Sequence, residues 1–340
     1  MHDNIEISVK GKWITVPALH VNGKNIIVRG KWMKLALVEA EEWLETEVED
    51  PDLCIKRLKE GRDRALAADV FTFSQKLPAT APKYSYPMEL DSIAAARTSN
   101  FKEWWEQLPQ ESRKNVRRAE KRGVVVSVKP LDDELVQGIM SVNNDSSTRQ
   151  GIRFVHYGKT AEEVKKDQSS YLDHSDFICA HYGTELIGFM KIVYRGNVAS
   201  ILQFLPKASE QDKRPANAML AKAVQVCEGK GISYLTYGQF NYGNKRENPL
   251  RDFKVRNGFR EILIPRFYVP LTPWGRLCVR MKLHRGLVGI LPHGVITAGV
   301  KARAKLYGVK QWMSRCSSML ERPNRNRQMG RSNPPAGSNV

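Results

Sequence analysis

The pattern of residues 176–270 is the strongest constraint on the fold of this chain. Three runs of strand-forming residues, FICAHYG, FMKIVY and VASILQFL, are separated by the turn sequences TELIG and RGN, which predicts an antiparallel meander. Pro215 then stands at the start of a helix, ANAMLAKAVQVCEGKG, which ends at Gly229 or Gly231. The strand ISYLTYG, a short helix around PLRDFKVRNG and a final strand pair in FREILIPRFYVPL complete the pattern.

A helix and a strand precede this pattern. The segment FKEWWEQLPQESRKNVRRAEKRG has helical spacing, with Ser112 as its N-cap after Pro109 and Gly123 as its end. The strand VVVSV follows directly. The order helix, strand, three meandering strands, helix, strand, helix, strand predicts an α/β (α+β) fold, in which helices flank both faces of a mixed, mostly antiparallel sheet.

The first 95 residues have a different pattern. Apolar and polar residues alternate in ISVKGKWITVPAL and KNIIVRGKWMKLAL, on either side of the turn HVNGK, which predicts a pair of strands. A polar helical stretch from Val38 to Phe73 follows, and the proline-containing segment SQKLPATAPKYSYPMEL predicts an extended connector. We therefore expect a small N-terminal unit with its connector over 1–95, the main domain over 96–270, a basic helical extension over 271–320 and a disordered tail over 321–340.

Composition excludes several classes of protein. A chain of 340 residues, 41% of them hydrophobic, buries a substantial core and is not disordered. Its five cysteines are scattered, with no C-x-x-C pair and no metal-like spacing with histidine, which predicts a reducing compartment and no metal. The opening MHDNIEISVKGKW has acidic residues and no apolar run, so we expect no signal peptide. Because the weakly polar run 287–300 falls short of the ~20 apolar residues that cross a bilayer, we expect a cytoplasmic protein without a membrane span.

Positive charge is concentrated at the end of the chain. The formal net charge is +18, and residues 271–340 contain 13 Lys or Arg against one acidic residue, Glu321. Aromatic and apolar residues are interspersed with these cations between Trp274 and Met319. This mixture predicts either a helical cap over the sheet with a basic outer surface, or a surface for an anionic membrane or RNA. The cap is the interpretation that we favour.

Three segments carry a resemblance to a known family. Residues 112–128, SRKNVRRAEKRGVVVSV, form a basic helix followed by A-x-K-x-G-V-x-V; residues 185–189, ELIGF, enter the second strand of the meander; and residues 249–259, PLRDFKVRNGF, contain a closing F-K motif. In this order and at these intervals, they resemble the FemABX-like branch of the GNAT superfamily of acyltransferases. The resemblance implies a sheet splayed between its fourth and fifth strands. It also implies direct transfer of an acyl group to an amine, without a covalent enzyme intermediate.

The resemblance implies two kinds of acyl donor and no tightly bound cofactor. Superfamily members that use coenzyme A usually carry a glycine-rich loop before the central helix, whereas LPKASEQDKRPANAML contains no glycine. The FemABX branch also lacks this loop and takes aminoacyl-tRNA, which suits a basic protein. We therefore expect acyl-CoA or aminoacyl-tRNA as co-substrate. The expected donor-binding residues are Lys207, Lys213, Arg214 and Asn217, at or before the N-terminus of the central helix.

Two residues are the candidates for catalysis. Lys254, in the F-K motif, matches a lysine that the family uses near the reacting carbonyl, where a cation stabilises the developing oxyanion. The alternative is a solvated helix lysine. Tyr237, at the end of the fifth strand, lies where the family places an acid, and its phenol would return a proton to the leaving group. The alternative for Tyr237 is a tyrosine at the edge of the core.

Four residues are the candidates for acceptor binding. Arg113 and Arg117, in the basic helix, are suited to phosphates of a nucleotide-linked acceptor or of RNA, because guanidinium groups pair bidentately with phosphate. Arg149 and His156, in STRQGIRFVHYG, fall where the family places a loop that lines the substrate. The alternatives are a solvated basic helix and a loop histidine without a chemical role.

Three functions fit these observations. The favoured one is an N-acyltransferase that moves an acyl or aminoacyl group onto an amine, nucleotide- or lipid-linked, in cell-wall or cell-surface polysaccharide assembly. The second is an amino-sugar acyltransferase that uses acyl-CoA or a carrier-bound donor. The third is a non-catalytic basic protein that binds nucleic acid or a membrane surface with the same fold. The partners expected beyond donor and acceptor are RNA or the inner face of the membrane, reached through the basic C-terminal end.

Overall fold

The computed structural model describes residues 2–9, 11–41, 47–61, 65–149, 152–241 and 249–285. All of them belong to one unit, Met1–Ile290. The expected basic helical extension is therefore described only as far as residue 285. The rest of it, and the expected tail, lie outside the described residues.

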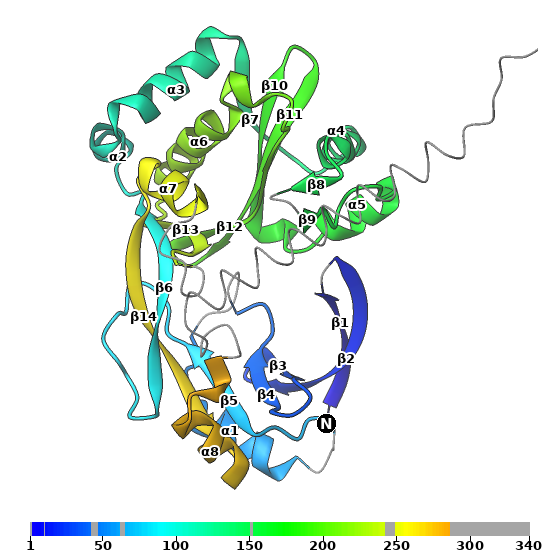
Figure 1. The fold of residues 1–340 in the computed structure, drawn as a ribbon, viewed down its shortest axis with the longest axis vertical. Helices are drawn as coiled ribbons and strands as arrows, with labels where there is room; N and C mark the ends of the chain where they lie inside the picture. Colours follow the sequence, from blue (N-terminus) through cyan, green and yellow to red (C-terminus); the bar gives the residue numbers. More distant parts are fainter. Residues whose placement is uncertain are drawn as a thin grey trace, which may run out of the picture. The chain divides into compact units, whose positions relative to one another are not determined.

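One mixed sheet of twelve strands runs through the described part of the chain, in the order β1-β2-β3-β4-β5-β14-β6-β13-β12-β11-β10-β7 (Figure 1). Among the described residues, neighbouring strands are antiparallel except at β4–β5 and β12–β13, which are parallel. The mixed, mostly antiparallel sheet is confirmed. The strands of this sheet are β1 (His2–Val9), β2 (Lys12–Val21), β3 (Lys24–Arg29), β4 (Leu35–Val38), β5 (Val70–Ser74), β6 (Met88–Arg97), β7 (Val124–Lys129), β10 (Ser175–Tyr182), β11 (Glu185–Arg195), β12 (Val198–Pro206), β13 (Tyr234–Gln239) and β14 (Arg260–Pro270).

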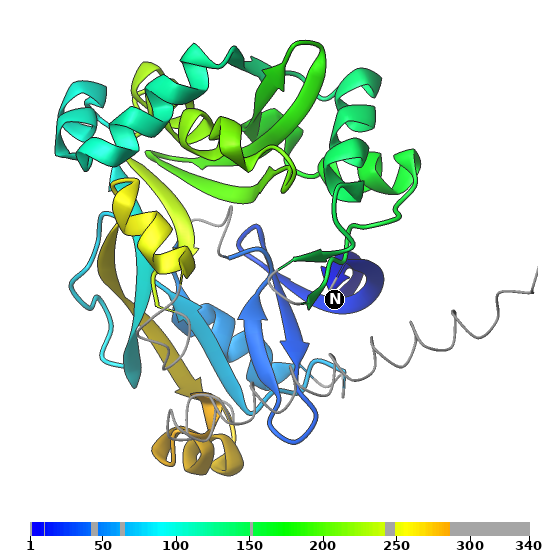
Figure 2. The ribbon, with the colours of Figure 1, turned by 45° about the horizontal axis from the view of Figure 1, so that its top comes forward.

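Helices cover both faces of the meander β10–β12, as Figures 1 and 2 show. On one face lie α2 (Phe101–Gln107), α3 (Gln110–Lys121) and α6 (Pro215–Gly229), and on the other lie α4 (Asp133–Asn144) and α5 (Ala161–Gln168). Burial alternates along β10, since Ile178 and Ala180 belong to the core under α6, whereas Phe177 and Cys179 belong to the core under α4. The flanking of the sheet by helices on both faces is confirmed.

The N-terminal region contains four strands where the sequence predicted two. Each expected strand is in fact a hairpin, β1–β2 and β3–β4. The chain turns at Gly11, with φ +76°, and again after Gly30, with φ +108°, and glycine takes such positive φ angles without strain. The predicted helical stretch was also too long. The helix α1 covers only Pro51–Glu60, and the aromatic and β-branched run that follows forms the fully buried strand β5.

Strand β6 runs across the boundary expected at residue 95 and joins the N-terminal strands to the main sheet, because it pairs with both β14 and β13. The first hairpin also contacts the segment around α5. The indole of Trp13 donates a hydrogen bond to Asp167 over 3.0 Å, and Lys159 donates one to the carbonyl of Gly11 over 3.0 Å. The N-terminal strands are therefore integrated with the rest of the described unit.

Two details of the predicted elements were wrong. Ser112 is not an N-cap, because α2 ends at Gln107 and α3 begins at Gln110, which places Ser112 inside α3. The predicted final strand pair is one continuous strand, β14, in which Pro265 has no amide hydrogen to donate while its carbonyl accepts a bond from the amide of Gln75 over 2.9 Å. The helix that begins at Pro215 and the helix end before Gly123 are confirmed.

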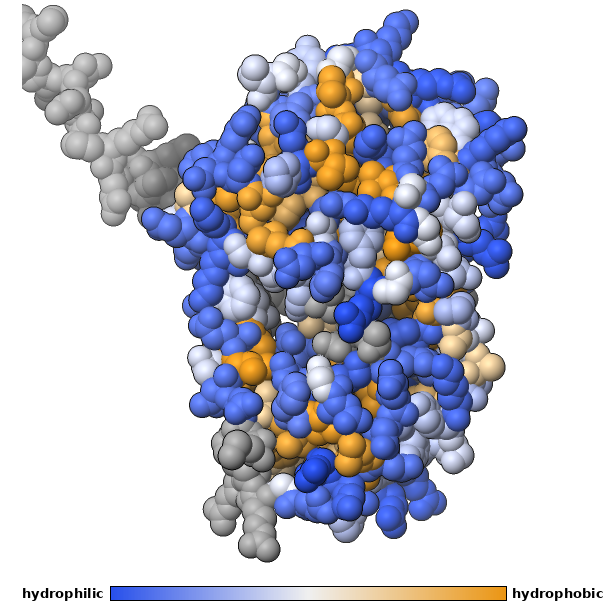
Figure 3. Space-filling view, turned by 180° about the vertical axis from the view of Figure 1, so that it is seen from behind, coloured by the Kyte–Doolittle hydropathy of each residue, from blue (hydrophilic) through white to orange (hydrophobic). Residues whose placement is uncertain are grey.

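Among the described residues, no helix has the length and the apolar character that crossing a membrane requires. The surface seen from behind is mostly hydrophilic, and its hydrophobic side chains gather in separate areas (Figure 3). The remaining described elements are the ribbon β8 (Thr148–Arg149) and β9 (Ile152–Arg153), the helices α7 (Pro249–Arg256) and α8 (Pro273–Arg280), and the short helical turns η1 (Leu172–His174), η2 (Gln211–Lys213) and η3 (Leu283–Arg285).

Candidate active site

The parallel strands β12 and β13 separate soon after they meet. Only Val198–Ser200 pairs with Tyr234–Thr236, whereas β12 continues to Pro206 and β13 to Gln239. Past the third pair, the described residues of the two strands make no further bridge to one another, so main-chain groups face an opening. When β7 is counted as the first strand, this opening lies between the fourth and the fifth, where the resemblance implied it.

A β-bulge decides which side of β12 faces this opening. Leu202 has no partner on β11, although Ile201 and Gln203 on either side of it are paired. An extra residue shifts the alternation of side chains along the strand. Ile201 and Phe204, three positions apart, therefore both reach the core under α6, and Phe204 lies at the opening.

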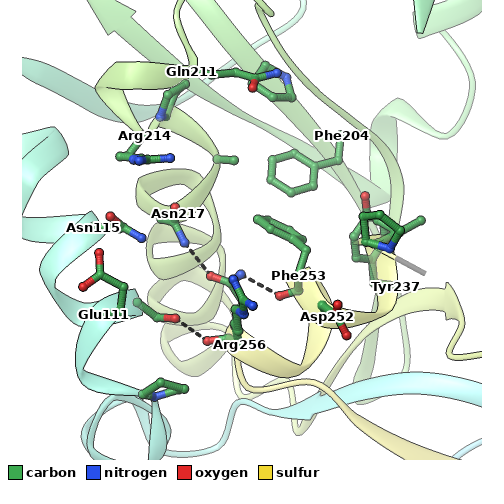
Figure 4. Close-up of a pocket in the computed structure, with 18 residues that line it drawn as sticks. Glu111, Asn115, Phe204, Gln211, Arg214, Asn217, Tyr237, Asp252, Phe253 and Arg256 are labelled. Atoms are coloured by element: carbon green, nitrogen blue, oxygen red, sulfur yellow. Dashed lines mark hydrogen bonds between the residues drawn. The ribbon is translucent and has the colours of Figure 1, made fainter. Parts of the chain in front are cut away.

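A cavity of about 1210 Å³ lies at the splay, on the side of α6 (Figure 4). Its aromatic part consists of Phe204, Tyr237 and Phe253, and the ring centre of Phe204 is 5.8 Å from that of Tyr237 and 6.0 Å from that of Phe253. Its polar part comes from α3, η2, α6 and α7. The cavity thus combines an apolar wall with hydrogen-bonding groups. The polar lining residues are Glu111, Ser112, Asn115, Gln211, Arg214, Asn217, Asp252, Arg256 and Asn257.

The N-terminus of α6 opens onto this cavity. Pro215 occupies the first helical position, and Arg214, Ala216 and Asn217 line the cavity around it. The first amides of a helix have no acceptor within it and carry the positive end of its dipole. Arg214 takes the left-handed conformation, with φ 58° and ψ 37°, in a segment that has no glycine. These features make the N-terminus of α6 suited to an anionic group.

Lys254 is buried beside Tyr237. Its side chain is fully buried, its Nζ donates a hydrogen bond to the carbonyl of Gln239 over 2.7 Å, and the same atom lies 4.5 Å from the ring centre of Tyr237. Burial lowers the pKa of Lys254 to about 8. The structure therefore brings the two predicted catalytic residues together, with Tyr237 lining the cavity and Lys254 packed behind its ring. A solvated lysine is not what the structure shows.

A chain of hydrogen bonds fixes α7 against α3 and α6. Asn217 donates to Oδ1 of Asn257 over 2.8 Å, and Nδ2 of Asn257 donates to the carbonyl of Phe253 over 2.7 Å (Figure 4). Ser112 donates to the carbonyl of Arg256 over 2.6 Å. Asn257, which is buried and lies within the F-K motif, was not predicted from the sequence as a site residue. Neither was Arg256, which lines the cavity.

The structure divides the predicted donor-binding residues. Arg214 and Asn217 line the cavity, whereas Lys207 and Lys213 do not. Lys207 is buried on the side of α4, where its ammonium forms an ion pair with Glu185 and donates to Ser141 over 2.8 Å. Lys213 forms an ion pair with Glu210, and its ammonium lies 4.8 Å from the ring centre of Tyr182.

The predicted acceptor-binding residues also lie outside this cavity. On α3, Arg113 comes one turn before Arg117, whose guanidinium carbon is 5.7 Å from the ring centre of Trp105. Arg149 lies at the end of β8 and donates to the carbonyl of Pro206 over 3.0 Å, and burial lowers its pKa. His156 has its Nδ1 3.3 Å from a carboxylate oxygen of Asp167. The structure does not bring these four residues together.

A second cavity, of about 410 Å³, lies on the other face of the splay. Thr236 and Gly238 line it, whereas Tyr237 between them lines the first cavity, because successive side chains of a strand point to opposite faces. The hydroxyl oxygens of Ser200 and Thr236, at the last bridge before the strands separate, are 2.9 Å apart. Charged residues of both signs complete the lining, namely Glu47, Glu49, Asp91, Lys76, Lys83, Arg195 and Arg266.

The fold of this chain is similar to the folds of proteins of known structure. No protein-family profile matches the sequence, and no curated protein matches it. A crystal structure of FemX is similar to this chain with a TM-score of 0.52 and 11% sequence identity, over 82% of this chain and 90% of FemX. The structure of L-PGS from Bacillus licheniformis is similar with a TM-score of 0.50 and 15% identity, over 78% of this chain and 85% of L-PGS. The chain therefore has a GNAT-like fold that it shares with FemX and L-PGS.

Proposed function

We propose that this chain is an N-acyltransferase, which transfers an acyl or aminoacyl group directly from its donor to an amine. The observation that carries the proposal is the cavity at the splay, where the N-terminus of α6, the open end of β12 and Tyr237 meet. The GNAT-like fold supports it. An acyl donor in this cavity would place its phosphate groups at α6 and its carbonyl near Tyr237.

Direct transfer needs few groups. The nitrogen of a neutral amine forms a bond with the acyl carbon, the bond from that carbon to the leaving sulfur or oxygen breaks, and the amine loses a proton while the leaving group gains one. Alignment of the reactants and stabilisation of the oxyanion supply most of the rate. We assign Tyr237 as the group that returns the proton. We assign Lys254, whose Nζ lies 4.5 Å from the ring centre of Tyr237, as the cation that stabilises the negative charge left on the Tyr237 oxygen when the phenol gives up its proton.

The described cysteines are not suited to a covalent intermediate. Cys54, Cys179, Cys227 and Cys278 are all buried, and none of them lines the cavity. Burial raises the pKa of each thiol, to about 11 for Cys54 and about 12 for Cys179 and Cys227. A buried neutral thiol is a poor nucleophile, which favours direct attack by the amine.

We assign the second cavity to the acceptor. It approaches the splay from the other face of β13, so an amine held there would reach a carbonyl held in the first cavity without competing for space. Two of its carboxylates are already ion-paired, Glu47 with Lys83 and Asp91 with Arg266, and Glu49 and Arg195 also line it. An acceptor that carries both an amine and an acidic group would therefore meet charges of both signs there. The cell-wall or cell-surface setting and the cytoplasmic location are part of this proposal, and the FemABX-like sequence motifs support them.

The donor is either an aminoacyl-tRNA or an acyl-CoA. The first follows from the sequence resemblance and the net charge of +18. The second is favoured by the size of the first cavity and by its aromatic wall beside a helix N-terminus, which suit an acyl chain and a pyrophosphate. Either donor would use the same reaction centre.

The test is to incubate the purified chain with acetyl-CoA, long-chain acyl-CoA or charged tRNA and an amino-sugar acceptor, and to detect the acylated amine by mass spectrometry. We expect Tyr237→Phe to lower turnover about 100-fold, as for removal of a general acid. Tyr194→Phe is the matched control, because Tyr194 donates to Asp176 over 2.7 Å within the meander. Absence of transfer with every donor, or equal turnover in the two variants, would contradict the proposal.

A further inference from the structure

An exposed group of apolar side chains lies away from both cavities, on α8, on the residue that follows it and on the connection between β3 and β4. It consists of Trp32, Trp274, Leu277 and Met281, whose exposed fractions are 60%, 43%, 45% and 58%. We call these four residues the tryptophan patch. The two indole rings meet edge to face with their centres 6.3 Å apart, and Nε1 of Trp274 donates to the carbonyl of Trp32 over 3.0 Å.

The fold holds this patch outward. The opposite side of α8 is packed against β5, where a side chain at Gly275 would come within 1.9 Å of the carbonyl oxygen of Asp69. Thr272 caps the helix by accepting from the amide of Gly275 over 3.0 Å, and its hydroxyl donates to Asp69 over 2.9 Å. Because α8 cannot rotate without breaking these contacts, Trp274, Leu277 and Met281 face solvent.

The patch is bordered by positive charge. Arg276, Arg280 and Lys282 are exposed on and after α8, and Arg29 and Lys31 are exposed around Trp32. The sequence carries no acidic residue between Glu261 and Glu321. Tryptophan and aliphatic side chains bordered by lysine and arginine suit the boundary between the headgroups and acyl chains of a bilayer that contains anionic lipid.

We propose that the tryptophan patch docks this chain on the surface of an anionic lipid bilayer. Charge argues against two other occupants. A second copy of the patch would bring like charges together, and residues 286–340 of the same chain contain nine Lys or Arg and one acidic residue, so they do not neutralise it. RNA would stack on the tryptophans, but it gains little from Leu277 and Met281. The proposal is independent of turnover, since it concerns a surface that lines neither cavity.

The test is co-sedimentation of the full chain with vesicles of phosphatidylcholine alone or with added phosphatidylglycerol, at low and high salt. We expect binding to the anionic vesicles that weakens with salt. We expect Arg276→Glu with Arg280→Glu to weaken it at least 25-fold, since each cation near an anionic surface contributes about fivefold. Trp274→Ala should weaken it roughly tenfold, from the apolar area that it no longer buries. Thermal melting checks that each variant is folded.

The matched control is Lys102→Glu with Lys121→Glu, on α2 and α3, at the other end of the described unit in Figures 1 and 2. It changes the net charge equally and should keep most of the binding. Equal losses in both double variants would overturn the proposal, and so would binding by the patch variants at the level of the unchanged chain. Patch variants that lose tRNA binding but keep vesicle binding would assign the surface to RNA instead.

A spectroscopic measurement tests the contact itself. Brominated acyl chains quench a tryptophan that reaches them, so they should quench the fluorescence of the bound chain. Trp32→Phe with Trp274→Phe keeps aromatic side chains at both positions. This variant should still bind the anionic vesicles, and it should lose most of the quenching. Quenching that persists in the variant would show that other tryptophans contact the lipid, and the proposal would be wrong.

Discussion

Two buried lysines lie at two regions of the same sheet, Lys191 on strand β11 and Lys254 on helix α7, and they differ in what surrounds them. Lys191 and Lys254 are both fully buried, and burial lowers the pKa of each to about 8. Lys191 lies on β11 in the closed meander, where its Nζ donates to the carbonyls of Gln168 and Ser170 over 2.6 and 2.5 Å. Lys254 lies at the splay, where its Nζ donates to the carbonyl of Gln239 on the open strand β13.

Burial and a lowered pKa therefore do not by themselves identify a catalytic lysine. Neither lysine is among the residues that line the two cavities described above. In the closed region, the ammonium of Lys191 holds a loop against the meander, and its hydrogen-bond partners Gln168 and Ser170 line neither cavity. In the open region, the ammonium lies behind Tyr237, which lines the first cavity. The position of the lysine relative to the opening of the sheet distinguishes the two roles.

The sharpest test of this comparison replaces each lysine with methionine. We expect Lys254→Met to lower turnover by about 10- to 30-fold, because a desolvated cation beside an aromatic ring contributes up to about 2 kcal/mol. Lys191→Met should keep turnover within a fewfold of the unchanged chain, although it leaves two carbonyls unpaired, each at a cost of about 1–3 kcal/mol. Steady-state kinetics and thermal melting on both variants measure the two effects.

If turnover falls in proportion to the loss of stability in both variants, the two lysines do not differ in role. In that case Lys254 would be a structural residue like Lys191. Lys254→Arg gives a further check, because it keeps the positive charge. Partial recovery of turnover with arginine would show that the charge matters and not only the filling of the site.

The pH dependence separates the same two residues. If positive charge on Lys254 is required, turnover should fall as the pH rises above about 8, the pKa of this lysine. A test amine of low pKa is already neutral there, so its own titration does not mask the fall. Lys191→Met should keep this profile. A turnover that rises steadily through pH 9 would show that the neutral form of Lys254 is the active one.

The stability of both regions should respond to pH in the opposite direction. Burial lowers the pKa of each lysine from its ordinary value of 10.5 to about 8 in the folded chain, so the unfolded chain binds more protons between these values. The burial penalty is complete below pH 8 and is relieved as the pH rises towards 10.5. Relative to each methionine variant, the unchanged chain should therefore gain stability across this window, as denaturant unfolding would measure.

The closed region was the easier one to predict from sequence. The runs FICAHYG, FMKIVY and VASILQFL correspond to β10, β11 and β12, because local periodicity and turn residues determine a meander. The first turn is shorter than the predicted TELIG, since β11 already begins at Glu185. The N-terminal strands were harder to predict. Two turns were missed because Lys10-Gly11 and Gly30-Lys31 interrupt the alternation without a longer polar segment.

The open region could be predicted only in part. Lys254 was predicted as a catalytic residue from the F-K motif, and Tyr237 from its place at the end of the strand ISYLTYG. The fold brings the two side chains into contact. The bulge at Leu202 and the bond from Asn217 to Asn257 could not be predicted, because each depends on how distant segments meet. Lys207 and Lys213 were predicted from their charge and their place before the central helix, and the structure pairs them with Glu185 and Glu210 outside the first cavity.

The smallest expected effect concerns the helix end that borders the open region. Arg214→Ala removes a cation from the cavity and keeps the left-handed backbone, whereas Arg214→Gly removes the cation and also relieves the backbone strain. Both should raise the KM for the donor by about tenfold, if Arg214 makes a charge-assisted contact with phosphate. Arg214→Gly should be more stable than Arg214→Ala by about 1 kcal/mol, the cost of this conformation for a residue with a Cβ.

Lys213→Ala is the control, because Lys213 is paired with Glu210 outside the cavity and its loss should leave the KM unchanged. A rise in KM for Lys213→Ala alone would place the donor phosphates on the η2 side of the helix end.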